Sequence, residues 1–419
     1  MTSGILKKIN INLAVIFLLV FSVKYFQGFP FEKAFFKLQA IFIVGLISFG
    51  IAFVLLKLLS GAGFRSYELY ILLLSLLIPI YSAFRAFFVF GQPVFMGFLK
   101  ERIWFTTLSG LLILYMLKIG KWKIQNILSS FLFISWVSLI GCYLLYVFGV
   151  PSGFEGSFIN FSPVKGIHYR IDNYFIVFGF LYYLIKSIKF KRPLLIFNLF
   201  LYGSYLFLLD KGRGMLVCVF LTTLAFIFNK TRFGFRNTVV IILVMILAFF
   251  SLYVFMGSNV TFFRSFGEII SLFDPGKSVS DNSIAARIFQ FNKIKDTLYS
   301  APGIILLGSG FLSNRWNNGF SGELDYFFPT DMGIVGVWFV YGIIGAVIIF
   351  FQLFIVFRFR ESDSLKNNET YLYFKYFFLF MVFKSILTGV IAFNPATFVI
   401  PGVVIYWFRS ENGGINYYK

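Results

Sequence analysis

The stretch from Gly257 to Thr330 reads GSNVTFFRSFGEIISLFDPGKSVSDNSIAARIFQFNKIKDTLYSAPGIILLGSGFLSNRWNNGFSGELDYFFPT and is the longest polar stretch of the chain. Apolar segments follow one another on both sides of it, so that 59% of all residues are hydrophobic and the mean hydropathy is +0.85. Apolar segments of about 20 residues can cross a bilayer as helices, which satisfy their own backbone groups in lipid. The sequence therefore predicts an all-α polytopic membrane protein with one long extracytoplasmic loop.

About twelve transmembrane helices are predicted from the apolar segments. They are expected near residues 9–23, 38–59, 67–88, 101–118, 127–148, 171–187, 194–209, 214–229, 237–256, 332–357, 371–392 and 397–408. The chain then divides into residues 1–256 with helices one to nine and short loops, the long loop 257–331, and residues 332–419 with the last three helices and a cytoplasmic tail.

Basic residues concentrate in alternate short loops, and such loops lie on the cytoplasmic side of a membrane. Both termini are therefore predicted to be cytoplasmic, and the long loop is predicted to face outward. The net charge of +20 follows mostly from this topology, because anionic inner-leaflet lipid attracts cytoplasmic cations. We accordingly expect membrane lipid, and no nucleic acid, as a partner. The two cysteines, Cys142 and Cys218, fall within predicted helices and offer the loop no disulfide.

The long loop contains a predicted amphipathic helix. Ser283 can cap its start, and the helix is expected to end near Tyr299, before Pro302. Its apolar residues share one stripe at 100° per residue, namely Ile284, Ile288, Phe291, Ile294 and Leu298. Arg287 and Lys295 fall within the same stripe. Either the Arg287 stem lies along lipid or protein while its head reaches water, or its guanidinium binds a buried carboxylate or phosphate.

Three stretches of the sequence resemble the superfamily of O-antigen polymerases (Wzy) and ligases. They are the junction FLLDKGRG at 207–214, the segment from Ala286 to Gly310, and PTDMG at 329–333, which enters a glycine-rich helix. The resemblance covers roughly residues 170 to 350. It implies a GT-C-like membrane fold and a glycosyltransferase on the outer face of the bacterial cytoplasmic (inner) membrane.

The implied reaction, in lipopolysaccharide or surface polysaccharide biosynthesis, joins oligosaccharide repeat units carried on undecaprenyl pyrophosphate, by inverting glycosyl transfer between a lipid-linked donor and acceptor. No cofactor or metal is expected, and a chain-length regulator protein is a further partner that the resemblance suggests. Ligases are expected to carry a histidine shortly before the span that follows the long loop, whereas the single histidine, His168, lies in another loop. Gly212 also stands where serine is common. Both departures favour a polymerase over the ligase alternative, and a lipid-linked oligosaccharide flippase is the alternative from another class.

Five outward or membrane-buried cations are candidates to bind the leaving pyrophosphate: Arg213, Arg287, Arg170, Arg85 and Lys384. Glycines flank Arg213, although a salt bridge to Asp210 would explain it equally. Arg170 can likewise pair with Asp172. Lys384 lies inside a predicted helix, where a charge costs about 2.5–3.5 kcal/mol and is by default a functional hypothesis, although structural pairing would also account for it.

Four residues are candidates to accept the proton of the attacking hydroxyl: Glu323, Asp325, Asp331 and His168. Asp331 can instead cap the tenth predicted helix, which would lower its basicity. Glu323 and Asp325 are spaced like a weak metal-binding pair, but no metal site is predicted. His168 has a suitable intrinsic pKa, but a lone loop histidine is usually solvated.

Overall fold

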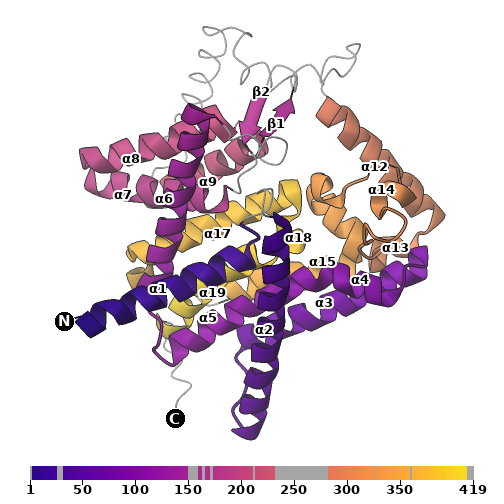
Figure 1. Cartoon of the computed structure of the whole chain (residues 1–419), viewed down its shortest axis with the longest axis horizontal. Helices are drawn as coiled ribbons and strands as arrows, with labels where there is room; N and C mark the ends of the chain where they lie inside the picture. Colours follow the sequence, from indigo (N-terminus) through magenta and orange to yellow (C-terminus); the bar gives the residue numbers. More distant parts are fainter. Residues whose placement is uncertain are drawn as a thin grey trace.

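The computed structural model describes residues 2–25, 32–149, 159–162, 166–169, 173–210, 213–231, 282–325, 327–358 and 361–412. In this part of the chain the structure is almost entirely helical, as expected, with one short antiparallel hairpin (Figure 1). The elements are α1 (Thr2–Ser22), α2 (Glu32–Leu59), α3 (Ser66–Phe90), α4 (Val94–Lys100), η1 (Glu101–Thr107), α5 (Leu108–Lys118), α6 (Ile124–Phe148), β1 (Ile159–Ser162), β2 (Gly166–Tyr169), α7 (Tyr174–Phe190), α8 (Pro193–Ser204), η2 (Tyr205–Asp210), α9 (Arg213–Thr231), α12 (Asn282–Ser300), α13 (Gly303–Leu307), α14 (Phe320–Glu323), η4 (Pro329–Met332), α15 (Gly333–Phe357), α16 (Asp363–Lys366), α17 (Glu369–Thr388), α18 (Val390–Phe393) and α19 (Ala396–Asn412).

Five of the described helical segments are long and apolar enough to cross a membrane: Ala34–Leu59, Ser66–Phe90, Ile124–Phe148, Pro329–Phe357 and Glu369–Thr388. They coincide with five of the predicted transmembrane helices. Shorter apolar helices, Asn10–Ser22, Pro193–Ser204 and Gly214–Asn229, lie at three more predicted positions. The predicted helix 237–256 lies outside the described residues. A helical protein suited to a membrane is thus confirmed, whereas the total of twelve helices and the three-part division stay predictions.

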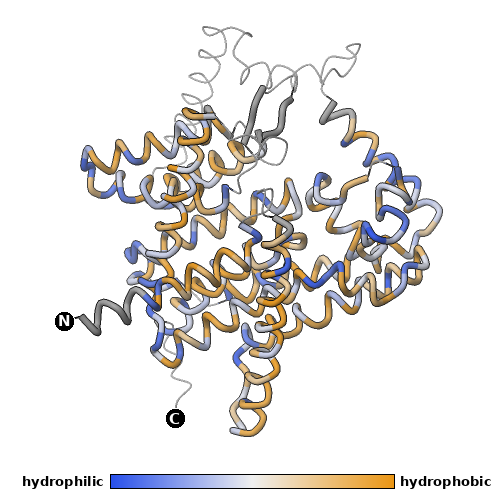
Figure 2. The backbone as a smooth tube through the Cα atoms, viewed as in Figure 1, coloured by the Kyte–Doolittle hydropathy of each residue, from blue (hydrophilic) through white to orange (hydrophobic). Residues whose placement is uncertain are grey.

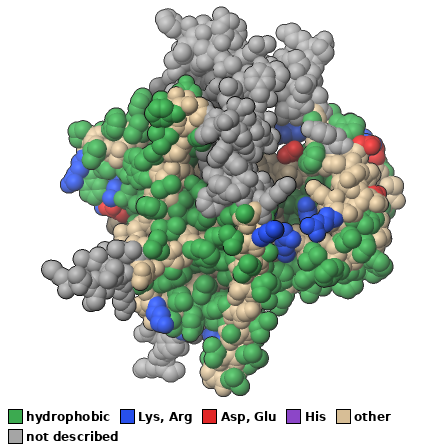
Figure 3. Space-filling model, viewed as in Figure 1, with side chains coloured by type: hydrophobic (Ala, Val, Ile, Leu, Met, Phe, Trp, Pro, Cys, Tyr) green, Lys and Arg blue, Asp and Glu red, His purple; other side chains and the backbone are tan. Residues whose placement is uncertain are grey.

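The surface of the described part is rich in apolar side chains, as expected for contact with lipid. Figure 2 shows hydrophobic residues along most helices, and Figure 3 shows apolar side chains over much of the visible face. Ile41 is 70% exposed, Phe88 is 70% exposed and Phe148 is 81% exposed. Contiguous apolar patches of this kind are rare on soluble monomers and typical of membrane contact.

The predicted helix 101–118 differs from the structure in its first half. It begins as the 3₁₀ helix η1, and only α5 is α-helical. The buried hydroxyl of Thr106 donates to the Ile103 carbonyl at 2.6 Å, and that of Thr107 donates to the Trp104 carbonyl at 2.6 Å. Side-chain bonds of this local kind compete with the regular α-helical ladder.

The long helix α15 is interrupted at Gly342, which has a φ of 67°. The segment that follows α13, residues 308–313, fills the interruption and is called here the inserted segment. The Ser309 N–H donates to the Phe339 carbonyl at 2.9 Å, and the Gly310 N–H donates to the Val340 carbonyl at 2.8 Å. The break in α15 therefore supplies the backbone acceptors that an irregular segment needs inside a membrane protein.

Helix α3 holds the other side of the inserted segment. The Phe311 N–H donates to the Ser82 hydroxyl at 2.9 Å, and the Ser313 N–H donates to the Gln92 side-chain carbonyl, just beyond α3, at 2.6 Å. Arg85 Nε donates to the Gly308 carbonyl at 3.0 Å. Part of the predicted outward loop is thus packed between α3 and α15 by hydrogen bonds.

The helix predicted in the long loop is confirmed as α12, within two residues at each end. The predicted apolar stripe is buried only in part, because Ile288 is 49% exposed and Phe291 is 50% exposed. The buried face is centred on Gln290 and Ile294, each 1% exposed. Gln290 Oε1 accepts a hydrogen bond from the Phe328 N–H at 3.3 Å, which turns this polar residue inward.

Candidate functional site

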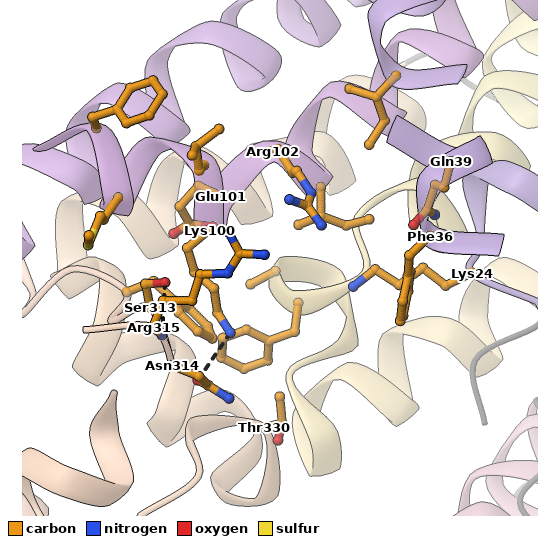
Figure 4. Close-up of a pocket in the computed structure, with 18 of the residues that line it drawn as sticks. Lys24, Phe36, Gln39, Lys100, Glu101, Arg102, Ser313, Asn314, Arg315 and Thr330 are labelled. Carbon is orange, nitrogen blue, oxygen red and sulfur yellow. Dashed lines mark hydrogen bonds between the residues drawn. The ribbon is translucent and has the colours of Figure 1, made fainter. Parts of the chain in front are cut away.

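A cavity of about 660 Å³ lies among α2, α4, η1, α18 and the chain around the inserted segment. Its size is that of a typical small-molecule site. Four basic side chains line it: Lys24, Lys100, Arg102 and Arg315. In the close-up they reach toward the same space from well-separated parts of the chain (Figure 4). The space-filling view also shows basic side chains gathered on one part of the visible face (Figure 3).

Within the described residues, none of these four cations forms an ion pair with a carboxylate. Lys100 Nζ makes only a 3.4 Å bond to Asn314 Oδ1 there and lies 5.0 Å from the Phe311 ring centroid. Burial and the neighbouring Arg102 lower the pKa of Lys100, against the opposing effect of Glu101. Among the described residues, four cations and one carboxylate line this cavity, and such an excess of positive charge favours an anionic ligand.

Lys24 follows α1 in a left-handed backbone conformation, with a φ of 55°. Burial, with the positive charges of Lys100 and Arg102, lowers its pKa to about 8. A bound anion would favour the charged form of this amine and oppose that effect.

We therefore expect anion affinity to fall as the pH rises from 7 to 9, because Lys24 loses its charge in the free protein within that range. The expected decrease is about tenfold, as for one favourable charge contact in a partly desolvated site. Calorimetric titration of the purified protein with sulfate, whose charge is constant over this range, measures it. Lys24→Met should remove the dependence, and a wild-type affinity that is flat with pH would contradict the assignment.

One acidic side chain is buried beside these cations. Glu101, 2% exposed, accepts a 2.5 Å hydrogen bond from the Ser82 hydroxyl and a 3.0 Å bond from the Tyr341 hydroxyl. Trp104 Nε1 donates in turn to the Tyr341 hydroxyl at 3.3 Å. The network joins α3, η1 and α15, and Ser82 also holds the inserted segment through Phe311.

The remaining wall of the cavity is largely apolar. Phe36 and Ile43 come from α2, while Phe95, Met96 and Leu99 come from α4. Phe95 is itself 70% exposed, so the apolar wall continues onto the outer surface. A cavity lined by both cations and apolar side chains, with an apolar wall that reaches the surface, matches an anionic group attached to a hydrophobic chain.

Three of the cations predicted from the sequence, Arg85, Arg287 and Lys384, do not line the cavity. Arg85 holds the Gly308 carbonyl and is a structural residue of the inserted segment. The exposed Arg287 interacts electrostatically with Asp331. Lys384 Nζ lies 3.5 Å from Asn173 Oδ1, on the side of α17 that packs against α7.

Two predicted cations are described incompletely or not at all. Arg213 begins α9, and a Cβ atom on the next residue, Gly214, would lie 3.4 Å from Leu387 at the end of α17. The start of α9 is therefore close to the helix that carries Lys384. The side chain of Arg213 and the whole of Arg170 lie outside the described residues.

Three of the four predicted bases do not line the cavity. Asp325 forms a 2.6 Å ion pair with Lys293 and is 71% exposed, and the exposed Glu323 accepts a 3.0 Å bond from Asn317. Asp331 is exposed beside the cavity-lining Thr330.

The capping alternative for Asp331 is wrong, because α15 begins at Gly333 and its N-cap is Met332. His168 pairs with Asn160 in the β1–β2 hairpin, and its side chain lies outside the described part.

Sequence reasoning missed the residues that line the cavity. The charged triplet Lys100, Glu101 and Arg102 follows the predicted helix 67–88 and the turn residues Gly91 and Pro93. A triplet of charges next to an apolar segment could have been recognised as a candidate site. Lys24 and Arg315 gave no such signal, since only the tertiary fold brings them beside the triplet.

No family model matches the chain, and neither a curated protein nor a solved structure matches it. The resemblance to O-antigen polymerases and ligases therefore depends on the residues quoted above.

Proposed function

We propose that this protein is a membrane-embedded polysaccharide polymerase that joins oligosaccharide repeat units carried on undecaprenyl pyrophosphate, in the manner of O-antigen polymerases. The observation that carries the proposal is the cavity lined by Lys24, Lys100, Arg102 and Arg315, cations that have no carboxylate partner among the described residues. The resemblance of the 207–214 and 286–333 stretches supplies the reaction class.

Pyrophosphate is a good leaving group whose departure places negative charge on its oxygens. Cations fixed in advance around those oxygens stabilise the transition state without reorganisation. Arg102 and Arg315 can each present a planar guanidinium fork to phosphate, whereas Lys24 and Lys100 act as point charges. The cavity would in this way bind the donor and favour breakage of its sugar–phosphate bond.

The lipid carrier gives the apolar wall a role. Phe36 and Ile43 on α2 face the same cavity as Phe95 and Leu99 on α4. An isoprenoid chain leaving the cavity past the exposed Phe95 would remain in apolar surroundings. We propose that the reaction takes place at the outer face of the bacterial inner membrane, with both termini in the cytoplasm.

The test is to express variants in a polymerase-deficient strain and to measure the length of its surface polymer. Lys100→Ala with Arg102→Ala is expected to reduce the ladder to single repeat units, because two pyrophosphate-facing charges are lost together. Lys121→Ala with Arg192→Ala removes two exposed charges away from the cavity and should leave the ladder intact.

Full-length polymer from the first double variant, at normal expression, would refute the site. If the wild-type protein restored no polymer but was needed for even one repeat unit to reach the surface, the ligase or flippase alternative would replace the polymerase.

A further inference from the structure

One carboxylate lines the cationic cavity among the described residues, and it belongs to Glu101. The acids predicted from the sequence, Glu323 and Asp325, are exposed and bonded elsewhere. We infer that Glu101 is the base that accepts the proton of the attacking sugar hydroxyl. This inference rests on the polymerase function proposed above and adds a catalytic residue to it.

The position of Glu101 suits a base that acts beside a pyrophosphate. Its sequence neighbours Lys100 and Arg102 line the same cavity, so the proton acceptor and the anion-binding cations lie side by side. The other cations that face the cavity are Lys24 and Arg315. Burial of Glu101 disfavours the ionised carboxylate, whereas the charge of Lys100 favours it, and the ionised form is the one that can accept a proton.

Hydrogen bonds hold the carboxylate in a fixed orientation. Oε1 accepts from both the Ser82 and the Tyr341 hydroxyls. Oε2 accepts the second, 3.2 Å branch of the Tyr341 bond. Since a carboxylate oxygen has two lone pairs, Oε2 keeps capacity for a substrate hydroxyl.

The hydrogen bonds to Ser82 and Tyr341 give no reason for a charge at this position. The structural reason for one is the carboxylate's electrostatic effect on Lys100 and Lys24. A glutamine could accept the same bonds from Ser82 and Tyr341 without the cost of burying a carboxylate. That cost is offset where the charged form takes part in chemistry, as buried acids at the edge of a cleft often do.

The proposed step is balanced as follows. The hydroxyl oxygen of the acceptor sugar forms a bond to the anomeric carbon of the donor, from the side opposite the phosphate, and its proton moves to Glu101. The bond between the anomeric carbon and the phosphate oxygen breaks, and its electron pair leaves with the undecaprenyl pyrophosphate. The cations of the cavity stabilise that anion, and Glu101 later returns the proton to water.

The test uses the purified full-length protein in proteoliposomes with a synthetic undecaprenyl-pyrophosphate oligosaccharide. Glu101→Gln is expected to lower kcat by about 10²–10⁴-fold, the usual contribution of a positioned base. KM and the affinity for inorganic pyrophosphate should stay within about threefold of wild type, because the cations remain. The control is Glu68→Gln, which alters an equally buried carboxylate that is paired with Lys57 away from the cavity and should keep kcat.

A second variant gives a readout that a structural role would not move. Tyr341→Phe keeps the Glu101 carboxylate and removes a donor that favours its charged form, so the acid limb of the rate–pH profile should shift to higher pH. This readout also applies if Glu101→Gln fails to fold.

Three results would overturn the inference. The first is a Glu101→Gln protein that keeps half of the wild-type kcat, and the second is one that loses kcat and pyrophosphate affinity to the same extent. The third is an unchanged acid limb in Tyr341→Phe. These results leave the polymerase function standing, whereas a wild-type protein that transfers no glycan from any lipid-pyrophosphate donor would remove both proposals.

Discussion

Gly342→Ala is expected to destabilise the protein by more than about 4 kcal/mol and to prevent its accumulation as a folded species. The positive φ of 67° alone costs an alanine about 1 kcal/mol. A Cβ atom there would also clash with the Gly308 nitrogen and the Leu306 carbonyl oxygen. Both are backbone atoms, so no side-chain rotation can relieve the clash. The inserted segment would then be displaced from α15, leaving carbonyls unpaired.

Two glycines serve as matched controls for this prediction. Gly61 has a φ of 63° with open space around its Cα, so Gly61→Ala should cost only the conformational term of about 1 kcal/mol. Gly45 lies in α2 with nothing near it, and Gly45→Ala should be neutral or slightly stabilising. The midpoint of thermal unfolding in detergent, with the yield of monodisperse protein, measures all three. A Gly342→Ala protein as stable as Gly61→Ala would contradict the packing described here.

Glu361→Gln is expected to have the second largest effect, a loss of about 2 kcal/mol in the free energy of unfolding. The Glu361 carboxylate lies 2.8 Å from Lys375 Nζ and 3.8 Å from Arg409 Nη2, and these side chains are 6–18% exposed. The amide would remove the negative charge that Lys375 and Arg409 share, a change that costs about 3–5 kcal/mol where burial is complete.

The same chain offers an exposed pair for comparison. Asp363 forms a 2.7 Å ion pair with Lys366, but its side chain is 94% exposed. Asp363→Asn should therefore change stability by no more than about 0.5 kcal/mol. Denaturation in detergent at low and moderate salt measures both variants. Equal effects of Glu361→Gln and Asp363→Asn would show that burial does not strengthen the Glu361 cluster.

Local sequence predicted the long helices because hydropathy is a local property. The ranges 38–59 and 67–88 fall within Ala34–Leu59 and Ser66–Phe90. The start and end of α12 were likewise predicted to within two residues from Ser283 and Pro302, but Ser283 lies inside the helix, which begins at Asn282. The buried face of α12 could not be predicted, because Gln290 is held inward by the Phe328 N–H, which lies far from the helix in sequence.

The cationic cavity shows the same division between local and tertiary information. Lys100 and Arg102 are visible in the sequence as charges that follow the turn at Gly91 and Pro93, but nothing in the sequence places Lys24 or Arg315 beside them. Conversely, Arg85 looked like a ligand-binding cation because it is charged and near a helix end. The structure shows it bonded to the Gly308 carbonyl, a backbone partner that no local pattern reveals.

The insertion of residues 308–313 between α3 and α15 also bears on the order of assembly. The N–H groups of Ser309 and Gly310 pair with carbonyls of Phe339 and Val340, which a ribosome synthesises later. The residues of α3 that contact the inserted segment consequently have no partner there until more than half of the chain has been synthesised. Packing of the late helices against α3 and of the inserted segment between them thus becomes a single, late event of biogenesis, governed by contacts of high sequence separation.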